Sequence, residues 1–193
     1  MEQKKKERKP IVTYLLSSAK MYIYTLIFTF VGFVFVAADL NRIVVLIMGV
    51  VFIAPVIILN YVSGKKEGET EYKKLNKSLL TDVHKQTHFK VKTIKSVYHV
   101  LGFFVLSLVL ILVAELCRWQ WLQGAMLILF TPTTLIFKAC GILDISVLSW
   151  FAMLPTMIYV VICCASFIIG YVLTVSKLRR RDTELVSEIR SYM

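Results

Sequence analysis

The sequence predicts an all-α integral membrane protein, with four transmembrane helices arranged as two antiparallel hairpins and a further segment that is interfacial or re-entrant on the outer face. Three observations support this fold class. Hydrophobic residues make up 58% of the 193 residues, and the mean hydropathy is +0.71, well above values typical of water-soluble domains. The apolar residues form long uncharged runs. Most basic residues gather in three blocks beside those runs, as loops and tails on the cytoplasmic side of a membrane do.

Residues 21–38 and 43–62 form the first predicted hairpin. Neither run contains a charged residue, and at about 1.5 Å per residue each is just long enough for a hydrocarbon layer of about 30 Å. The link at 39–42 is so short that the two spans must be antiparallel. The start of the chain also has the features of a secretory signal, but cleavage after the first run would remove half of a packed hairpin. We therefore expect the first span to be retained.

The linker at 63–95 carries nine lysines and four acidic residues, so we expect it to be cytoplasmic. Within it, residues 69–84 have the apolar spacing of an amphipathic helix. The third predicted span is 97–116, which is interrupted by His99 near its start and by Glu115 near its end.

The outer-face segment at 117–149 is apolar in its middle but contains Pro132. Counting it as a full span would export the basic tail at 176–193, against the positive-inside rule. We therefore expect a fourth span at 152–175, a cytoplasmic tail, and both termini on the cytoplasmic side of the cell membrane. The outer segment is then either an interfacial helix or a pair of half-helices broken at Pro132. The second form requires that other parts of the protein cover the break.

Six charged residues fall near the predicted outer face. Two acid–base pairs have i,i+3 spacing and sit at the outer ends of neighbouring spans, so a polar or ion-relay cluster is geometrically possible. The alternatives are ion pairs that fix the ends of the spans and, for the lysine, a side chain that reaches the outer headgroups. The candidates are Asp39, Arg42, Glu115, Arg118, Lys138 and Asp144.

Basic residues on the predicted inner face are candidates for contact with the bilayer, through anionic headgroups, or with a cytosolic partner. They are Lys73, Lys74, Lys77, Arg179, Arg180 and Arg181. Because the basic blocks flank apolar runs, we expect no nucleic-acid partner. His84 and His88 have an i,i+4 spacing that can hold a metal, but lysines surround them and the third ligand would have to be Asp82 or the remote His99. We therefore expect neither metal nor cofactor.

Two local features concern packing. Ser166 and Gly170 form a small-xxx-small pair that allows another helix to approach closely. The sequence at 38–42 is echoed at 114–118, which is either an internal duplication or a coincidence of helix ends. The layout, with a basic inner loop, a proline in the outer segment and a last span that includes Leu154-Pro155 and Gly170-Tyr171, resembles that of small bacterial membrane proteins built from two helical hairpins. This resemblance implies no activity.

The sequence contains no catalytic motif, and we expect no helix face with paired carboxylates. Our leading hypothesis is therefore a non-enzymatic accessory or scaffold protein. The first alternative is a small transporter or channel subunit that uses the outer charged cluster, as a homo-oligomer or with a membrane partner, because four short helices enclose little space. The second alternative is a membrane enzyme or an immunity-type protein.

Overall fold

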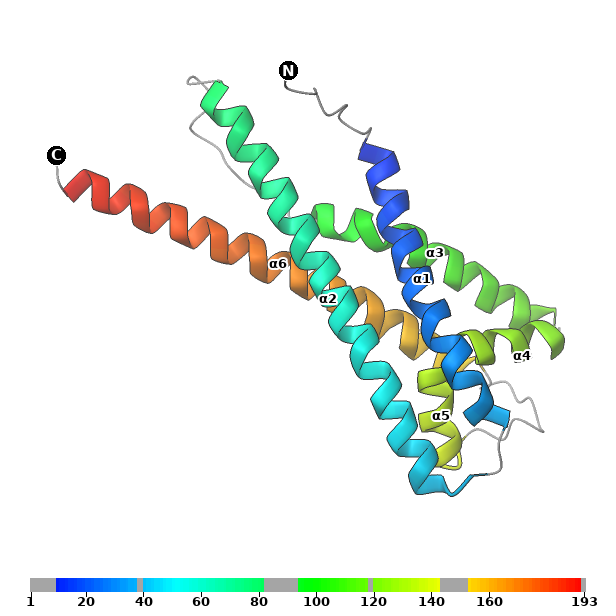
Figure 1. The fold of residues 1–193 in the computed structure, drawn as a ribbon. Helices are drawn as coiled ribbons and strands as arrows, with labels where there is room; N and C mark the ends of the chain where they lie inside the picture. Colours follow the sequence, from blue (N-terminus) through cyan, green and yellow to red (C-terminus); the bar gives the residue numbers. More distant parts are fainter. Residues whose placement is uncertain (1–9, 38–39, 82–93, 118–119, 143–152, 192–193) are drawn as a thin grey trace, which may run out of the picture.

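The computed structural model describes residues 10–37, 40–81, 94–117, 120–142 and 153–191, which form helices and no strand. The helices are α1 (Pro10–Ala37), α2 (Arg42–Thr81), α3 (Ile94–Leu116), α4 (Gln120–Leu129), α5 (Thr131–Ala139) and α6 (Leu154–Ser191) (Figure 1). By length and composition, four of them are able to cross a membrane: α1, α2, α3 and α6. The bent pair α4–α5 would add a fifth if it is a single span. The all-helical class with several long apolar helices is thus confirmed.

The four long helices all exceed the predicted spans, α3 by only three residues. The apolar part of α1 begins at Ile11 instead of residue 21. α2 has 40 residues and α6 has 38, which at about 1.5 Å per residue gives roughly 60 and 57 Å. Part of the linker at 63–95 and most of the tail at 176–193 are therefore continuous with the helices that precede them.

Local sequence accounts for the helix boundaries. α1 begins at Pro10, and proline suits the first turn of a helix because its missing N–H has no partner there. The side-chain oxygen of Asn41 accepts a hydrogen bond from the N–H of Ile43 at 2.9 Å and so caps the start of α2. After α5 the chain turns at Gly141, which has a φ of 71°. This left-handed conformation is one that glycine adopts without strain.

α2 packs along α6 more extensively than along any other helix. Where the two helices cross, glycines have no side chain to keep the backbones apart. A Cβ at Gly64 would lie 2.1 Å from the Phe167 carbonyl oxygen, and one at Gly170 would lie 2.2 Å from the Tyr61 carbonyl oxygen. The close approach predicted for Gly170 is confirmed. Beyond this crossing, the C-terminal parts of α2 and α6 diverge (Figure 1).

α5 also packs closely against glycines, one in α1 and one in α2. A Cβ at Gly32 would meet the Thr131 side chain, and one at Gly49 would meet Ile136 and the Pro132 carbonyl oxygen. Aromatic and aliphatic side chains from α3, α6 and the α4–α5 break fill the core behind it, among them Phe103, Phe130, Tyr159 and Phe167. The break and the first half of α5 are therefore an internal part of the bundle.

Candidate functional site

The buried face of α3 is partly polar. Ser96, His99 and Ser107 are each 0% exposed and alternate with Val100 and Phe103 on the same face. Buried polar groups are costly unless they find hydrogen-bond partners, so this face requires polar neighbours.

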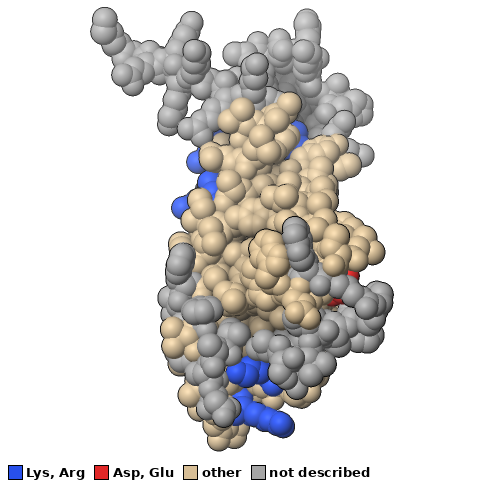
Figure 2. All heavy atoms as spheres, turned by 90° about the vertical axis from the view of Figure 1, so that its right-hand side faces the viewer, with Lys and Arg blue, Asp and Glu red and all other residues tan. Residues whose placement is uncertain are grey.

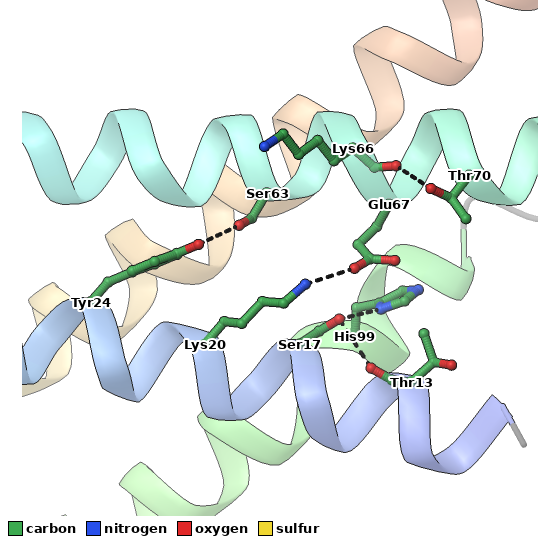
Figure 3. A network of polar contacts seen from close by, with 9 residues as sticks. All are labelled: Thr13, Ser17, Lys20, Tyr24, Ser63, Lys66, Glu67, Thr70 and His99. Carbon is green, nitrogen blue, oxygen red and sulfur yellow. Dashed lines mark hydrogen bonds and ion pairs between the residues drawn. The ribbon is translucent and has the colours of Figure 1, made fainter. Parts of the chain in front are cut away.

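Side chains from α1 supply several of those partners (Figure 3). Ser17 Oγ lies 2.9 Å from His99 Nδ1, and the Ser18 hydroxyl donates to the His99 carbonyl oxygen at 3.1 Å. One helical turn further on, the Tyr22 hydroxyl lies 2.9 Å from Ser107 Oγ. α1 and α3 are thus joined by polar contacts as well as by apolar packing.

Two ion pairs tie α2 to these helices. Lys20 Nζ of α1 lies 3.1 Å from Glu67 Oε1, and Lys95 Nζ of α3 lies 2.8 Å from Glu71 Oε2. Both glutamate side chains are only 15% exposed, whereas both lysines are 39% exposed. Glu67 and Glu71 are four residues apart and so share one face of α2. The expectation that no helix face carries paired carboxylates is therefore wrong.

His99 also lies among aromatic rings. The ring of Tyr14 meets it edge-on with centroids 4.7 Å apart, and the rings of Phe167 and Tyr171 have centroids at 5.8 and 6.0 Å. His99 Nε2 and the Tyr171 hydroxyl are both buried, and neither has a hydrogen-bond partner among the described residues. We refer to the following set as the His99 cluster: Tyr14, Ser17, Lys20, Glu67, Glu71, Lys95, His99 and Tyr171.

A second polar feature lies at the α4–α5 break, where the helices bend by 98°. The carbonyl oxygens of residues 127–129 at the end of α4, and that of Phe130 between α4 and α5, all accept hydrogen bonds from threonine hydroxyls. Thr134 donates to the carbonyl of residue 127 at 2.8 Å and Thr29 to that of residue 129 at 2.6 Å. Thr131 and Thr133 donate to those of residues 128 and 130. These contacts satisfy the backbone groups that a break inside the protein would otherwise leave unpaired.

The predicted outer charges are only partly described. Glu115 is half-buried, and its Oε1 accepts a hydrogen bond from the Met153 N–H at 3.3 Å. Arg42 is exposed at the start of α2, with Nη1 4.0 Å from a Cβ position at Gly141, while Lys138 is half-buried in the last turn of α5. Asp39, Arg118 and Asp144 lie outside the described residues.

The predicted inner-face candidates lie on the long helices α2 and α6. All of those with described side chains are exposed, namely Lys73, Lys74, Arg179, Arg180 and Arg181, whereas the side chain of Lys77 lies outside the described part. On the face drawn in Figure 2, basic side chains lie towards both ends of the molecule, with a broad zone of other residues between them. His84 and His88 lie outside the described residues.

The His99 cluster was not predicted as a site. In the sequence, His99 is an interruption of an apolar run and a remote candidate for the third ligand beside His84 and His88. The i,i+4 spacing of Glu67 and Glu71 was available in the sequence, but it becomes meaningful only if the helix after residue 62 is continuous. No sequence pattern pairs Ser17 with His99 or brings Tyr171 to it, because these contacts join segments that are far apart in the chain.

No protein-family model, curated protein or solved structure matches this chain.

Proposed function

We propose that α1, α2, α3 and α6 cross the cell membrane, with both termini on the cytoplasmic side and α4–α5 entering from the outer side. The described start of the chain and the C-terminal ends of α2 and α6 all lie in the upper part of Figure 1, which supports a shared face for them. The basic residues near these ends favour the cytoplasm for that face. In this arrangement, α1–α2 and α3–α6 are two hairpins that interlock, since α2 packs most extensively on α6.

On this topology, the protein is a non-enzymatic membrane scaffold whose cytoplasmic surface binds anionic lipid headgroups. One observation carries the proposal: α2 and α6 extend well beyond the roughly 30 Å needed to cross a hydrocarbon layer, and their extensions expose basic side chains. The acidic residues of the α2 extension are not exposed in the same way. Glu67 and Glu71 face neighbouring helices and pair with lysines there. Pairing of Glu67 and Glu71 with lysines inside the bundle leaves an excess of basic side chains on the other faces, where Glu69 is half-buried and four lysines are exposed: Lys65, Lys66, Lys73 and Lys74.

The test is lipid selectivity of the full chain in nanodiscs that contain phosphatidylcholine with a minor fraction of phosphatidylglycerol. We expect phosphatidylglycerol to be enriched around the protein, measured by native mass spectrometry or by spin-labelled lipids. Each basic residue near a membrane surface contributes about 1 kcal/mol, so replacing Lys73, Lys74 and Lys77 by glutamine should weaken the preference on the order of 100-fold at low salt. Arg42→Gln, at the other end of α2, is the matched control. Equal enrichment in the triple variant and the wild type would contradict the proposal.

A small transporter or channel remains the second candidate, and the α4–α5 break favours it. A sharply bent helix pair whose backbone is covered by protein is a common way to bring polar groups to the middle of a membrane. Proton flux into proteoliposomes loaded with a pH-sensitive dye tests this function. Flux that is present in the wild type and lost in Glu115→Gln would support it, while absence of flux in the wild type would count against proton transport.

A further inference from the structure

Ser17 determines which nitrogen of His99 carries the hydrogen. A serine hydroxyl has a single hydrogen to donate. Ser17 Oγ lies 3.1 Å from the Thr13 carbonyl oxygen, which can only accept, and 2.9 Å from His99 Nδ1 (Figure 3). Both contacts are satisfied when Ser17 donates to Thr13 and accepts from an N–H at Nδ1. In the neutral imidazole, Nε2 is then the atom with the free lone pair.

That lone pair is buried next to a suitable donor. His99 and Tyr171 are both 0% exposed, and neither Nε2 nor the Tyr171 hydroxyl has a hydrogen-bond partner among the described residues. The two rings are neighbours in the core, tilted by 41° with centroids 6.0 Å apart. Buried polar atoms without partners are uncommon in folded proteins, and the unpartnered Nε2 lone pair is the atom of this cluster that can take up a proton.

Charged groups approach His99 from several packed helices. α1 contributes Lys20 and the phenol of Tyr14, α2 contributes Glu67 and Glu71, and α3 contributes Lys95. α6 contributes Tyr171. With neutral His99, the two carboxylates and the two ammonium groups balance. A proton on His99 adds one positive charge, and the imidazolium then competes with Lys20 and Lys95 for the same carboxylates.

We propose that His99 Nε2 is a buried proton-binding site, and that Glu67 and Glu71 couple its occupancy to the attachment of α2 to α1 and α3. The proton comes from water on the side of the lysine–glutamate pairs. It adds to the Nε2 lone pair, and no other bond breaks. This site is independent of lipid binding by the basic extensions.

The imidazole is observable directly in the full chain. The sequence has three histidines, so His84→Gln with His88→Gln leaves His99 as the sole ¹⁵N-histidine signal in detergent micelles. We expect the Nδ1–H tautomer near neutral pH and a reversible conversion to the doubly protonated ring on acidification, while circular dichroism shows that the helices are retained. The Nε2–H tautomer at neutral pH, or a ring that stays neutral at every pH at which the chain is folded, would overturn the proposal.

Variants test the partners. Tyr171→Phe should move the titration midpoint by about half a pH unit or more, whereas Tyr98→Phe, on an exposed neighbour of His99, should leave it in place. Glu67→Gln combined with Glu71→Gln should also move the midpoint. Glu69→Gln is the matched control, because it removes a carboxylate from another face of α2. If the control variants move the midpoint as far as the test variants, the assigned coupling is wrong.

Discussion

Replacement of Gly64 by alanine tests the crossing of α2 and α6, where the two backbones approach closely. A Cβ at this position would lie 2.1 Å from the carbonyl oxygen of Phe167 and 2.9 Å from its carbonyl carbon. Non-bonded carbon and oxygen atoms at helix interfaces approach to about 3.3 Å. The two backbones must therefore separate by about 1 Å.

The expected cost follows from this displacement. Overpacking in a well-packed interior costs about 1–3 kcal/mol, and here the obstacle is a backbone carbonyl, which cannot rotate away as a side chain does. Alanine recovers about 0.5–1 kcal/mol because it favours the helix over glycine. We expect Gly64→Ala to lower the free energy of unfolding by about 1–2 kcal/mol.

The assay is unfolding of the full chain in mixed micelles with an increasing mole fraction of dodecyl sulfate, monitored by circular dichroism. Gly124→Ala in α4 is the matched control, because a Cβ there meets nothing within 4 Å. This control should be neutral or slightly more stable than the wild type. Gly68→Ala should fall between the two, since its Cβ would lie 3.0 Å from the Tyr171 carbonyl oxygen. Coincident unfolding of the Gly64 and Gly124 variants would refute the close crossing.

Three other predictions use the same preparations. Thr134→Val removes the threonine donor of the carbonyl oxygen of residue 127 at the α4–α5 break and should cost about 1–3 kcal/mol in the same unfolding assay. A double-mutant cycle on Lys20 and Glu67 should give a coupling of about 0.5–1 kcal/mol that decreases with added salt, because the lysine is partly exposed. A maleimide reagent should modify the exposed Cys117 and Cys140 in the folded protein, as followed by mass spectrometry. It should reach the two buried thiols only after unfolding: Cys163 and Cys164.

Each of these measurements has an internal comparison. For the threonine at the break, Thr70→Val is suitable, because the Thr70 hydroxyl makes a similar contact with the Lys66 carbonyl oxygen but is exposed. A loss in Thr70→Val as large as that in Thr134→Val would remove burial as the cause. Salt-independent coupling in the cycle would mean that Lys20 and Glu67 interact through packing. Modification of all four cysteines in the folded state would contradict the burial of the Cys163 and Cys164 side chains in α6.

The apolar runs made most of the helices predictable. Uncharged runs of about 20 residues indicated the cores of α1, α2, α3 and α6, since a helix needs that length to cross a hydrocarbon layer. Pro132, inside an otherwise apolar segment, indicated a break, and the structure places that break at Phe130, directly before α5. Small residues at 166 and 170 indicated a close contact, which Gly170 makes. These features depend on local sequence alone.

The helix ends are less predictable from the sequence, because charged residues that usually mark the end of a membrane span are paired with other helices in this protein. Lys20 lies well inside α1, since Glu67 offers it a partner from α2. α2 also continues without interruption past residue 62, through a basic linker in which the sequence indicated a helix only from residue 69. Gly64 and Gly68 repeat the small-xxx-small spacing and contact α6. The sequence does not indicate this contact, because the two glycines lie after the apolar run.

The His99 cluster depends on two features: the extension of α2 beyond its apolar part and the close contact of α2 with α6. Helix α2 continues beyond its apolar part, and at Gly64 and Gly68 its backbone packs closely against α6. The face of α2 that carries Glu67 and Glu71 is thereby turned towards Lys20, Lys95 and His99. An alanine at Gly64 should then disturb the titration of His99 as well as the stability of the fold. If stability falls while the His99 titration stays unchanged, the crossing and the cluster are separate features. The proposed coupling of α2 to the proton site would then not depend on the contact between α2 and α6.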